Sequence, residues 1–355
     1  MQSTDGHTFE LHSDVTRTPV RFRNRYGIEL AGELYAPANQ SRPLPALAVS
    51  GPFGAVKEQA SGHYANELAH RGFVALAFDP SFTGESGGEV RDVASPDIFT
   101  EDFSAAVDHL VTRNDVDADR IGVQAICGLA SMAITAATGD SRIKAVATSS
   151  MYDMARSISR SLQDAYTPEQ RAKVVDHISQ QRTLDARSGT VTRGLHEIPF
   201  DENGNIVTRE KLFPNELPAD ADPVTRAFFD YYRTDRGFAE RSINSTSAWT
   251  ATTPMPFFEF SLMEHLDLLG ERQVLLAAGE RAHSLYYSED VHRKAPDNTE
   301  LVIIPGADHV DLYDQDDLIP YDKIVDFFTT QLGSLLPRSG TAPGRSPYRT
   351  TTAKE

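Results

Sequence analysis

The stretch RIGVQAICGLASMAI, from Arg120 to Ile134, decides the fold and contains the single cysteine of the chain, Cys127. The apolar residues before Cys127 predict a buried strand, and the alanine-rich residues after it predict a helix. A side chain on the tight turn between them is held above the end of the strand. The N-terminus of the following helix favours negative charge and lowers the pKa of a thiol. Cys127 is therefore a candidate nucleophile.

The small residues around Cys127 have the spacing of a nucleophile elbow, with Cys where Ser is usual and Leu129 where a small residue is usual. The alternative is that Cys127 is a structural residue, because free cysteine is among the most buried residue types. A serine nucleophile at Ser131 or Ser149 is disfavoured, since neither lies at the tip of the turn. Residues elsewhere in the chain must decide between these interpretations.

Composition excludes several classes of protein. The 355 residues are 40% hydrophobic and 24% charged, which is enough for one large domain or for a core domain with an insertion. A single cysteine excludes an intramolecular disulfide. The net charge of −17, without a clustered basic face, argues against a nucleic-acid partner. The eleven histidines are scattered without metal-ligand spacing, so we expect neither a metal nor another cofactor.

The first residues, MQSTDGHTFELHSD, contain no apolar targeting segment, and no apolar run in the chain is long enough to span a bilayer. We therefore expect a cytoplasmic protein without a membrane partner. The sequence leaves a homo-oligomer open.

Strand and helix patterns alternate at short spacing through most of the chain. An antiparallel hairpin is predicted by the alternating hydrophobicity of residues 20–24 and 28–37. Further predicted strands are 44–50, 73–78, 121–126, 143–148, 273–278 and 300–304. The predicted helices between and after them are 64–71, 102–113, the segment after Cys127, 289–294 and 321–332. This order predicts an α/β fold, with a mostly parallel, doubly wound sheet covered on both faces.

The alternation stops between residues 155 and 269, where the sequence is polar and aromatic with helical patterns at 168–180 and 223–232. We interpret this stretch as a largely helical cap inserted between two strands of the core. The predicted division is an unanchored N-terminal lead-in (1–18), the first part of the core (19–154), the cap (155–269), the second part of the core (270–336) and a disordered tail (337–355). The aromatic residues of the cap either shape an apolar pocket or form its own core: Tyr231, Tyr232, Trp249, Phe257 and Phe258.

Parallel sheets place ligands outside the carboxyl ends of their strands, so we expect reactive groups in the loops there. His309 follows the strand 300–304, comes after Cys127 in the chain and precedes the last helix. This position predicts a general base, against the alternative of a solvated loop histidine. Glu280, in the loop after strand 273–278, is the nearest candidate for the acid that orients His309. Asp153, after the preceding core strand, is the alternative acid.

The loop GPFGAVKEQ follows the strand 44–50, and its backbone N–H groups can point at a ligand. We expect an oxyanion hole formed by the N–H groups of Gly128 and of Phe53 or Gly54. The alternative is that the loop is a simple turn. Lys57 and Glu58 in the same loop are interpreted as a solvated pair.

These motifs together resemble the α/β-hydrolase superfamily: the elbow, GPFGAVKEQ, DPSFTGESGG, SMYDM and GADHVDLYD. More narrowly, the chain is similar to the branch related to dienelactone hydrolases and Xaa-Pro peptidase-like hydrolases, whose elbow often carries cysteine and is followed by A-H-S and H-V-D-L-Y-D segments. The resemblance covers most of residues 18–333. It implies an α/β-hydrolase fold with Cys127 as nucleophile and His309 as base. Fungal relatives in this branch include thioester hydrolases and acyltransferases, so the resemblance indicates a reaction class and not one substrate.

We therefore expect a hydrolase that cleaves an ester, thioester or lactone of a small-molecule acyl substrate. The expected mechanism forms an acyl-enzyme on Cys127, with His309 as base and Glu280 as acid. One alternative is an acyltransferase on the same scaffold. The other is a binding protein that keeps the fold with weakened catalysis, suggested by the irregular elbow at Leu129.

Overall fold

The computed structural model of the chain describes residues 6–333 and 349–351. Within them, one nine-stranded sheet dominates the molecule. It consists of β1 (Val15–Arg23), β2 (Glu29–Pro37), β3 (Leu44–Ser50), β4 (Val74–Phe78), β5 (Val116–Ile126), β6 (Ile143–Ser149), β9 (Gln273–Gly279), β10 (Thr299–Ile304) and β11 (Arg349–Thr351). A small second sheet pairs β7 (Arg193–Gly194) with β8 (Trp249–Thr250).

The strand order in the large sheet is β1-β2-β4-β3-β5-β6-β9-β10-β11. The pairs β1/β2, β2/β4 and β10/β11 are antiparallel, and the pairs between them are parallel. The central strands are apolar on both faces, as in β4, whose sequence VALAF is buried at every position. Such strands are typical of a parallel sheet covered on both sides.

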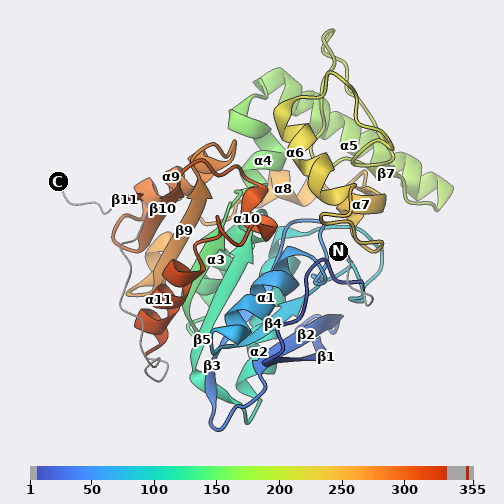
Figure 1. The fold of residues 1–355 in the computed structure, drawn as a ribbon. Coiled ribbons are helices and arrows are strands. Elements are labelled where there is room, and N and C mark those ends of the chain that lie inside the picture. Colours follow the sequence, from blue (N-terminus) through green and yellow to red (C-terminus); the bar gives the residue numbers. More distant parts are fainter. Residues whose placement is uncertain (1–5, 334–348, 352–355) are drawn as a thin grey trace.

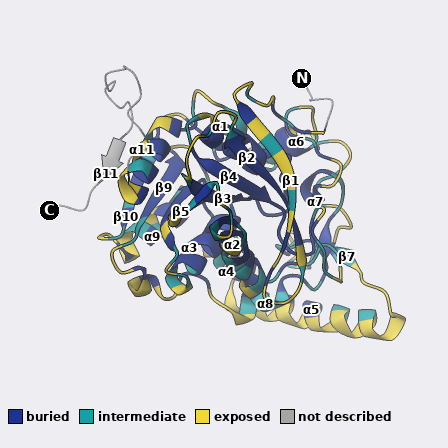
Figure 2. Ribbon diagram, turned by 90° about the horizontal axis from the view of Figure 1, so that it is seen from below, coloured by how far each residue is buried: buried dark blue, intermediate teal, exposed yellow. Residues whose placement is uncertain are grey.

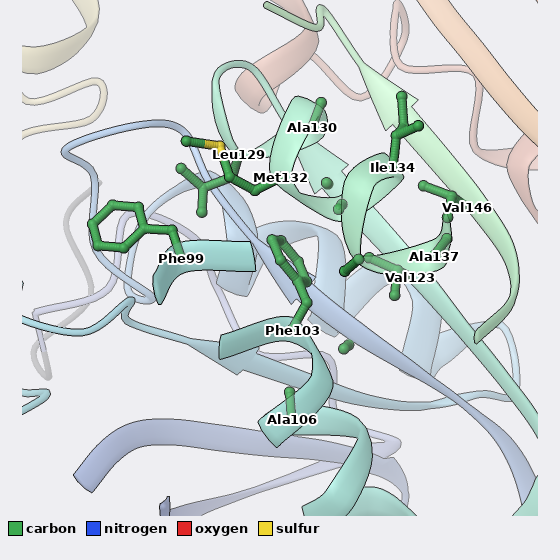
Figure 3. Packing of buried hydrophobic residues seen from close by; sticks show 14 of the residues in the cluster. Phe99, Phe103, Ala106, Val123, Leu129, Ala130, Met132, Ile134, Ala137 and Val146 are labelled. Carbon is green, nitrogen blue, oxygen red and sulfur yellow. The ribbon is translucent and has the colours of Figure 1, made fainter. Parts of the chain in front are cut away.

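Helices cover both faces of this sheet (Figure 1). Hydrophobic residues of α1 (Ala60–His70) and α11 (Tyr321–Leu332) form one core with the sheet. Those of α2 (Pro96–Val111), α3 (Leu129–Gly139) and α9 (Leu285–Lys294) form the other. Figure 3 shows the second core, with Phe99 and Phe103 of α2 near Leu129 and Met132 of α3. The predicted α/β class and doubly wound sheet are confirmed.

Residues 150–272 form a segment inserted between β6 and β9, and most of it gathers at one end of the sheet (Figure 1). We call it the inserted segment. Besides β7 and β8 it contains α4 (Met154–Arg160), η1 (Leu162–Asp164), α5 (Pro168–Ser188), α6 (Pro223–Tyr232), α7 (Ile243–Thr246), α8 (Met255–Glu259) and η2 (Leu266–Leu269). The long helix α5 projects from the body of the molecule, and most of its surface is exposed (Figure 2). Only Val174 and Ile178 of α5 are buried.

The N-terminal lead-in differs from the prediction, because residues 6–14 are anchored to the core and β1 begins already at Val15. The ring of His7 contacts the carboxylate of Glu33 at 2.8 Å, and the ring of His12 contacts that of Glu67 at 2.5 Å. These partners lie far along the chain, so hydrophobicity patterns near the N-terminus do not reveal them.

The predicted tail, 337–355, lies outside the described residues except for Arg349–Thr351, which form β11 beside β10. Across residues 6–333, no helix is both long enough and apolar enough to cross a membrane.

Candidate active site

Cys127 lies at the turn between β5 and α3, at the carboxyl end of the central strand of the large sheet. Its backbone φ is +56°, in the left-handed region that a non-glycine residue enters only at an energetic cost. Three backbone hydrogen bonds hold this conformation. The Cys127 N–H donates to the Ser149 carbonyl at 2.9 Å, and the Cys127 carbonyl accepts from the N–H groups of Ala130 and Tyr152, each at 3.1 Å.

The residue after Cys127 must be small. A Cβ atom on Gly128 would lie 2.6 Å from Sδ of Met154 and 2.8 Å from Cβ of Phe53. Leu129, the irregular position of the elbow, is fully buried in the hydrophobic core together with Met132 (Figure 3). The core therefore accommodates the bulk of Leu129, and the turn remains tight.

The Cys127 thiol is buried, and hydrogen-bonding groups converge on it. Burial raises the pKa of the thiol to about 11. Hydrogen bonds that the Tyr313 hydroxyl and the backbone N–H groups of Gly128 and Phe53 donate to the thiolate act in the opposite direction and favour that form. The structure thus brings two of the predicted oxyanion groups, Gly128 and Phe53, to the sulfur of Cys127.

The third predicted oxyanion residue, Gly54, is held by the inserted segment. Its carbonyl oxygen accepts hydrogen bonds from Ser242 Oγ at 3.0 Å and from the Asn244 N–H at 3.3 Å. Asn244 Nδ2 also donates to the Phe53 carbonyl at 2.9 Å. Residues at the start of α7 therefore fix the loop that presents the Phe53 N–H to Cys127.

Lys57 and Glu58, expected to be a solvated pair, are buried instead. Lys57 Nζ lies 2.6 Å from Glu58, 3.3 Å from Asp79 and 2.9 Å from Glu85. The Lys57 and Asp79 side chains are 3% and 0% exposed. The segment DPSFTGESGG packs against the loop and supplies the two further carboxylates, those of Asp79 and Glu85. The cluster therefore forms only when the two segments pack together in the folded chain.

His309 lies in the loop after β10 and is buried, with hydrogen-bond partners at both ring nitrogens. Nδ1 lies 2.6 Å from Ser284 Oγ, and Nε2 lies 2.9 Å from the Tyr313 hydroxyl. Burial, and to a smaller extent the neighbouring His283, hold the pKa of His309 well below its usual value. His309 is therefore neutral near pH 7. Within residues 6–333, no direct hydrogen bond joins His309 to Cys127; the Tyr313 hydroxyl contacts His309, and the Tyr313 side chain lines the same pocket as Cys127.

Neither predicted acid is hydrogen-bonded to His309 in the described part of the chain. The carboxylate of Glu280 is exposed and accepts the Gly306 N–H at 3.0 Å. Asp153 caps α4, where its carboxylate accepts the Arg156 N–H at 3.1 Å. The position at Nδ1 is occupied by Ser284, in the same loop as Glu280.

Sequence reasoning missed Ser284 and Tyr313. Ser284 stands four residues after Glu280, and Tyr313 stands four residues after His309, in the loop GADHVDLYD. Neither residue belongs to a sequence motif that marks a catalytic side chain. Their roles become visible only when the loops after β9 and β10 are placed side by side.

An apolar pocket of about 220 Å³ opens onto Cys127. Its walls come from the core loops and from the inserted segment. The lining residues are Pro52, Phe53, Cys127, Tyr152, Met154, Leu162, His196, Glu197, Leu212, Phe213, Val224, Thr225, Phe228, Tyr232, Asn244 and Tyr313. Of the aromatic residues predicted for the cap, Tyr232 lines this pocket, whereas Trp249 packs on Phe53 with ring centroids 4.3 Å apart.

Two ionisable groups of the inserted segment also line the pocket. Burial raises the pKa of Glu197 to about 7, although a hydrogen bond from Ser157 opposes the shift. Burial lowers the pKa of His196 to about 4, so His196 is neutral at physiological pH.

One group of side chains in the described residues has converging metal-type donors: His12, Asp14 and His70. These donors are already paired within the protein, since His70 Nδ1 lies 2.8 Å from Asp14 and His12 lies against Glu67. The group does not line the pocket at Cys127.

The chain is similar to known proteins in both sequence and structure. A family model described as X-Pro dipeptidyl-peptidase (S15 family) matches residues 26–202. Uncharacterized protein PA2218 from Pseudomonas aeruginosa is 48% identical over 326 residues, which cover 92% of this chain and 83% of that protein. The crystal structure of PA2218 matches with a TM-score of 0.84 and covers 92% of this chain and 96% of that chain.

Two more distant proteins are also similar. Thiohydrolase aneE from Aspergillus aculeatus is 27% identical over 58% of this chain and 64% of its own length. The α/β hydrolase GrgF from Penicillium sp. sh18 is 19% identical, with a TM-score of 0.69 over 89% of this chain and 99% of that chain. The likeness to GrgF bears on the fold alone, and it agrees with the α/β-hydrolase fold that the sequence predicts.

Proposed function

The chain belongs to the same family as PA2218 and has an α/β-hydrolase fold, and we propose that it is a hydrolase that cleaves an ester, thioester or lactone through an acyl-enzyme on Cys127. One observation carries the proposal. The Cys127 sulfur lies at a strained turn, lines an apolar pocket and faces two backbone N–H groups. A nucleophile with hydrogen-bond donors at its side and an apolar space in front of it is the arrangement that acyl transfer requires.

In the proposed reaction, the Cys127 thiolate attacks the carbonyl carbon of the substrate. The N–H groups of Phe53 and Gly128 stabilise the oxyanion that forms. His309, neutral near pH 7, accepts the thiol proton and returns it to the leaving group. Water then attacks the acyl-enzyme, with His309 again as base. The mechanism assigns no step to Glu280, because a thiol depends less than a hydroxyl on a third catalytic group.

The pocket supports a substrate with a compact apolar acyl group. Its space of about 220 Å³ is modest, and aromatic side chains such as Phe213, Phe228 and Tyr232 form much of its wall. We propose that the inserted segment acts as the cap of the active site, since it supplies these residues. The thiohydrolase relative favours thioesters among the candidate substrates.

The test compares wild-type protein with Cys127→Ala on p-nitrophenyl acetate, butyrate and octanoate, on the matching acyl thioesters of N-acetylcysteamine, and on an Xaa-Pro p-nitroanilide. We expect turnover of the short esters and thioesters, and a loss of about a thousandfold or more in the variant. Ser131→Ala is the control for a serine nucleophile, because the Ser131 hydroxyl donates to the Gly128 carbonyl within the turn. Intact-mass spectrometry of a slowly hydrolysed ester checks for an acyl adduct on residue 127.

Unchanged turnover in Cys127→Ala would contradict the proposed mechanism. Products acylated on an added alcohol or amine would favour the acyltransferase alternative. A Cys127 that neither turns over substrates nor forms the adduct would favour a binding protein.

A further inference from the structure

The thiol of Cys127 and the ring of His309 are connected through a third side chain. The Tyr313 hydroxyl lies 2.9 Å from Nε2 of His309. Tyr313 and Cys127 line the same pocket, and the Tyr313 side chain is the one whose hydrogen bond favours the Cys127 thiolate. We propose that Tyr313 relays the proton from the thiol of Cys127 to Nε2 of His309. This inference rests on the proposed function, because it specifies how the nucleophile of that reaction is activated.

The hydrogen-bond directions along this path are consistent with one another. The Tyr313 O–H can donate to Nε2 only if that nitrogen carries no proton, and the proton of the neutral ring then lies on Nδ1. From Nδ1 it is donated to Ser284 Oγ, 2.6 Å away. The hydroxyl oxygen of Tyr313 is left to accept the thiol proton. The resting site is therefore a directed chain from Sγ–H through the phenol to Nε2.

The transfer balances without any further reactant. The S–H bond of Cys127 breaks as a new O–H bond forms on Tyr313, while the original O–H bond of Tyr313 breaks and an N–H bond forms on His309. The products are a thiolate, an imidazolium and an unchanged phenol. Burial raises the pKa of Tyr313 well above its usual value, which disfavours a tyrosinate intermediate and favours concerted movement of both protons.

Packing prevents Tyr313 from moving aside to let His309 reach the sulfur. Its side chain is 0% exposed, and its ring contacts those of Tyr231 and Tyr232 at 5.1 and 6.4 Å between centroids. The helix that carries it, α10 (Asp311–Asp314), is tied on two sides. The Tyr64 hydroxyl donates to the Leu312 carbonyl at 2.8 Å, and Arg236 forms a two-pronged ion pair with Asp314 at 2.7 and 2.8 Å.

Tyr313→Phe tests the proposal, because it removes only the hydroxyl. We expect kcat for p-nitrophenyl butyrate to fall about a hundredfold, the scale of a lost proton-transfer group, while KM changes little. Tyr287→Phe is the matched control, since Tyr287 is equally buried and does not line the pocket. Its kcat should stay within twofold of wild type.

The rate at which iodoacetamide alkylates Cys127 is the second readout, and it needs no substrate. With a relay, wild-type alkylation has a component that is independent of pH below the thiol pKa, because neutral His309 removes the proton. Tyr313→Phe and His309→Ala should both lose this component and show a rate that rises tenfold per pH unit. A merely structural role of Tyr313 would not change the shape of this profile.

The outcomes separate the relay from the proposed function. If Tyr313→Phe keeps the wild-type kcat and alkylation profile while His309→Ala loses them, the relay is wrong and the function stands. If Cys127→Ala leaves ester turnover unchanged, the proposed function is wrong. The pH dependence of Cys127 alkylation in wild type and Tyr313→Phe still tests the relay in that case. If Tyr313→Phe does not fold, the proton inventory of wild-type kcat in mixed H₂O and D₂O replaces it. A curved inventory supports two protons in flight, and a linear one contradicts the relay.

Discussion

Gly279, the last residue of β9, should be needed for full activity, although its φ lies outside the left-handed region that favours glycine. A Cβ atom at this position would lie 2.4 Å from the Ala307 carbonyl oxygen and 2.9 Å from that of Asp308, in the loop that carries His309. Cβ contacts essentially never fall below 3.0 Å, and here both neighbours are backbone atoms. In Gly279→Ala the loop after β10 must therefore move away from β9 by about half an ångström or more, and His309 moves with this loop.

The magnitude follows from the sensitivity of catalysis to geometry. A misplacement of about 1 Å can cost ~100-fold in rate, so a shift of about half that size predicts a loss of ~10-fold in kcat/KM for p-nitrophenyl butyrate. Overpacking should also lower the free energy of unfolding by about 1–3 kcal/mol. Gly139→Ala, at the end of α3, is the control, because a Cβ there meets nothing within 4 Å. A folded Gly279→Ala with full activity would refute the reasoning that this strand end positions the base.

Three further predictions concern buried ionisable groups. Lys57→Met leaves the fully buried Asp79 without its cation and should lower the free energy of unfolding by about 3–5 kcal/mol in urea denaturation; a loss below ~1 kcal/mol would contradict this. Glu197 is neutral below its pKa of about 7 and ionised above it, so KM for p-nitrophenyl octanoate should rise between pH 6 and 8, and Glu197→Gln should abolish that rise. Ser284→Asp places a carboxylate at Nδ1 of His309 and favours the imidazolium, so the acid limb of the kcat/KM profile should move to higher pH; an unmoved limb would show that Ser284 does not govern His309.

The fold was predictable from sequence because its signals are local. The parallel core strands are short apolar runs, the first hairpin shows alternating hydrophobicity, and the core helices show an apolar face within their own residues. The turn at Cys127 belongs to the same category, since the apolar run before it and the small residues around it are contiguous. Chain order then placed His309 after it, on a loop that the structure brings near the same end of the sheet.

The contacts of the site were less accessible, because they join distant parts of the chain. Glu280 was chosen as acid by its place in a loop, and the ring of His309 instead contacts Ser284 from that loop. Lys57 was expected in solvent because its immediate neighbours do not reveal Asp79, twenty-two residues away, as its buried partner. Pairings of this kind depend on how two loops pack, and the hydrophobic pattern contains no information about it.

The bonds from Ser242 and Asn244 to the Phe53–Gly54 backbone have a consequence for how substrate range can change. Recognition and reactivity are mechanically coupled here, because one short helix both borders the pocket and sets the position of an oxyanion donor. Mutations on the exposed surface of α5, which does not line the pocket, should leave the reaction centre undisturbed. A mutation in α7 that widens the pocket would also shift the Phe53 N–H, so new acyl groups accepted by that route would be turned over more slowly.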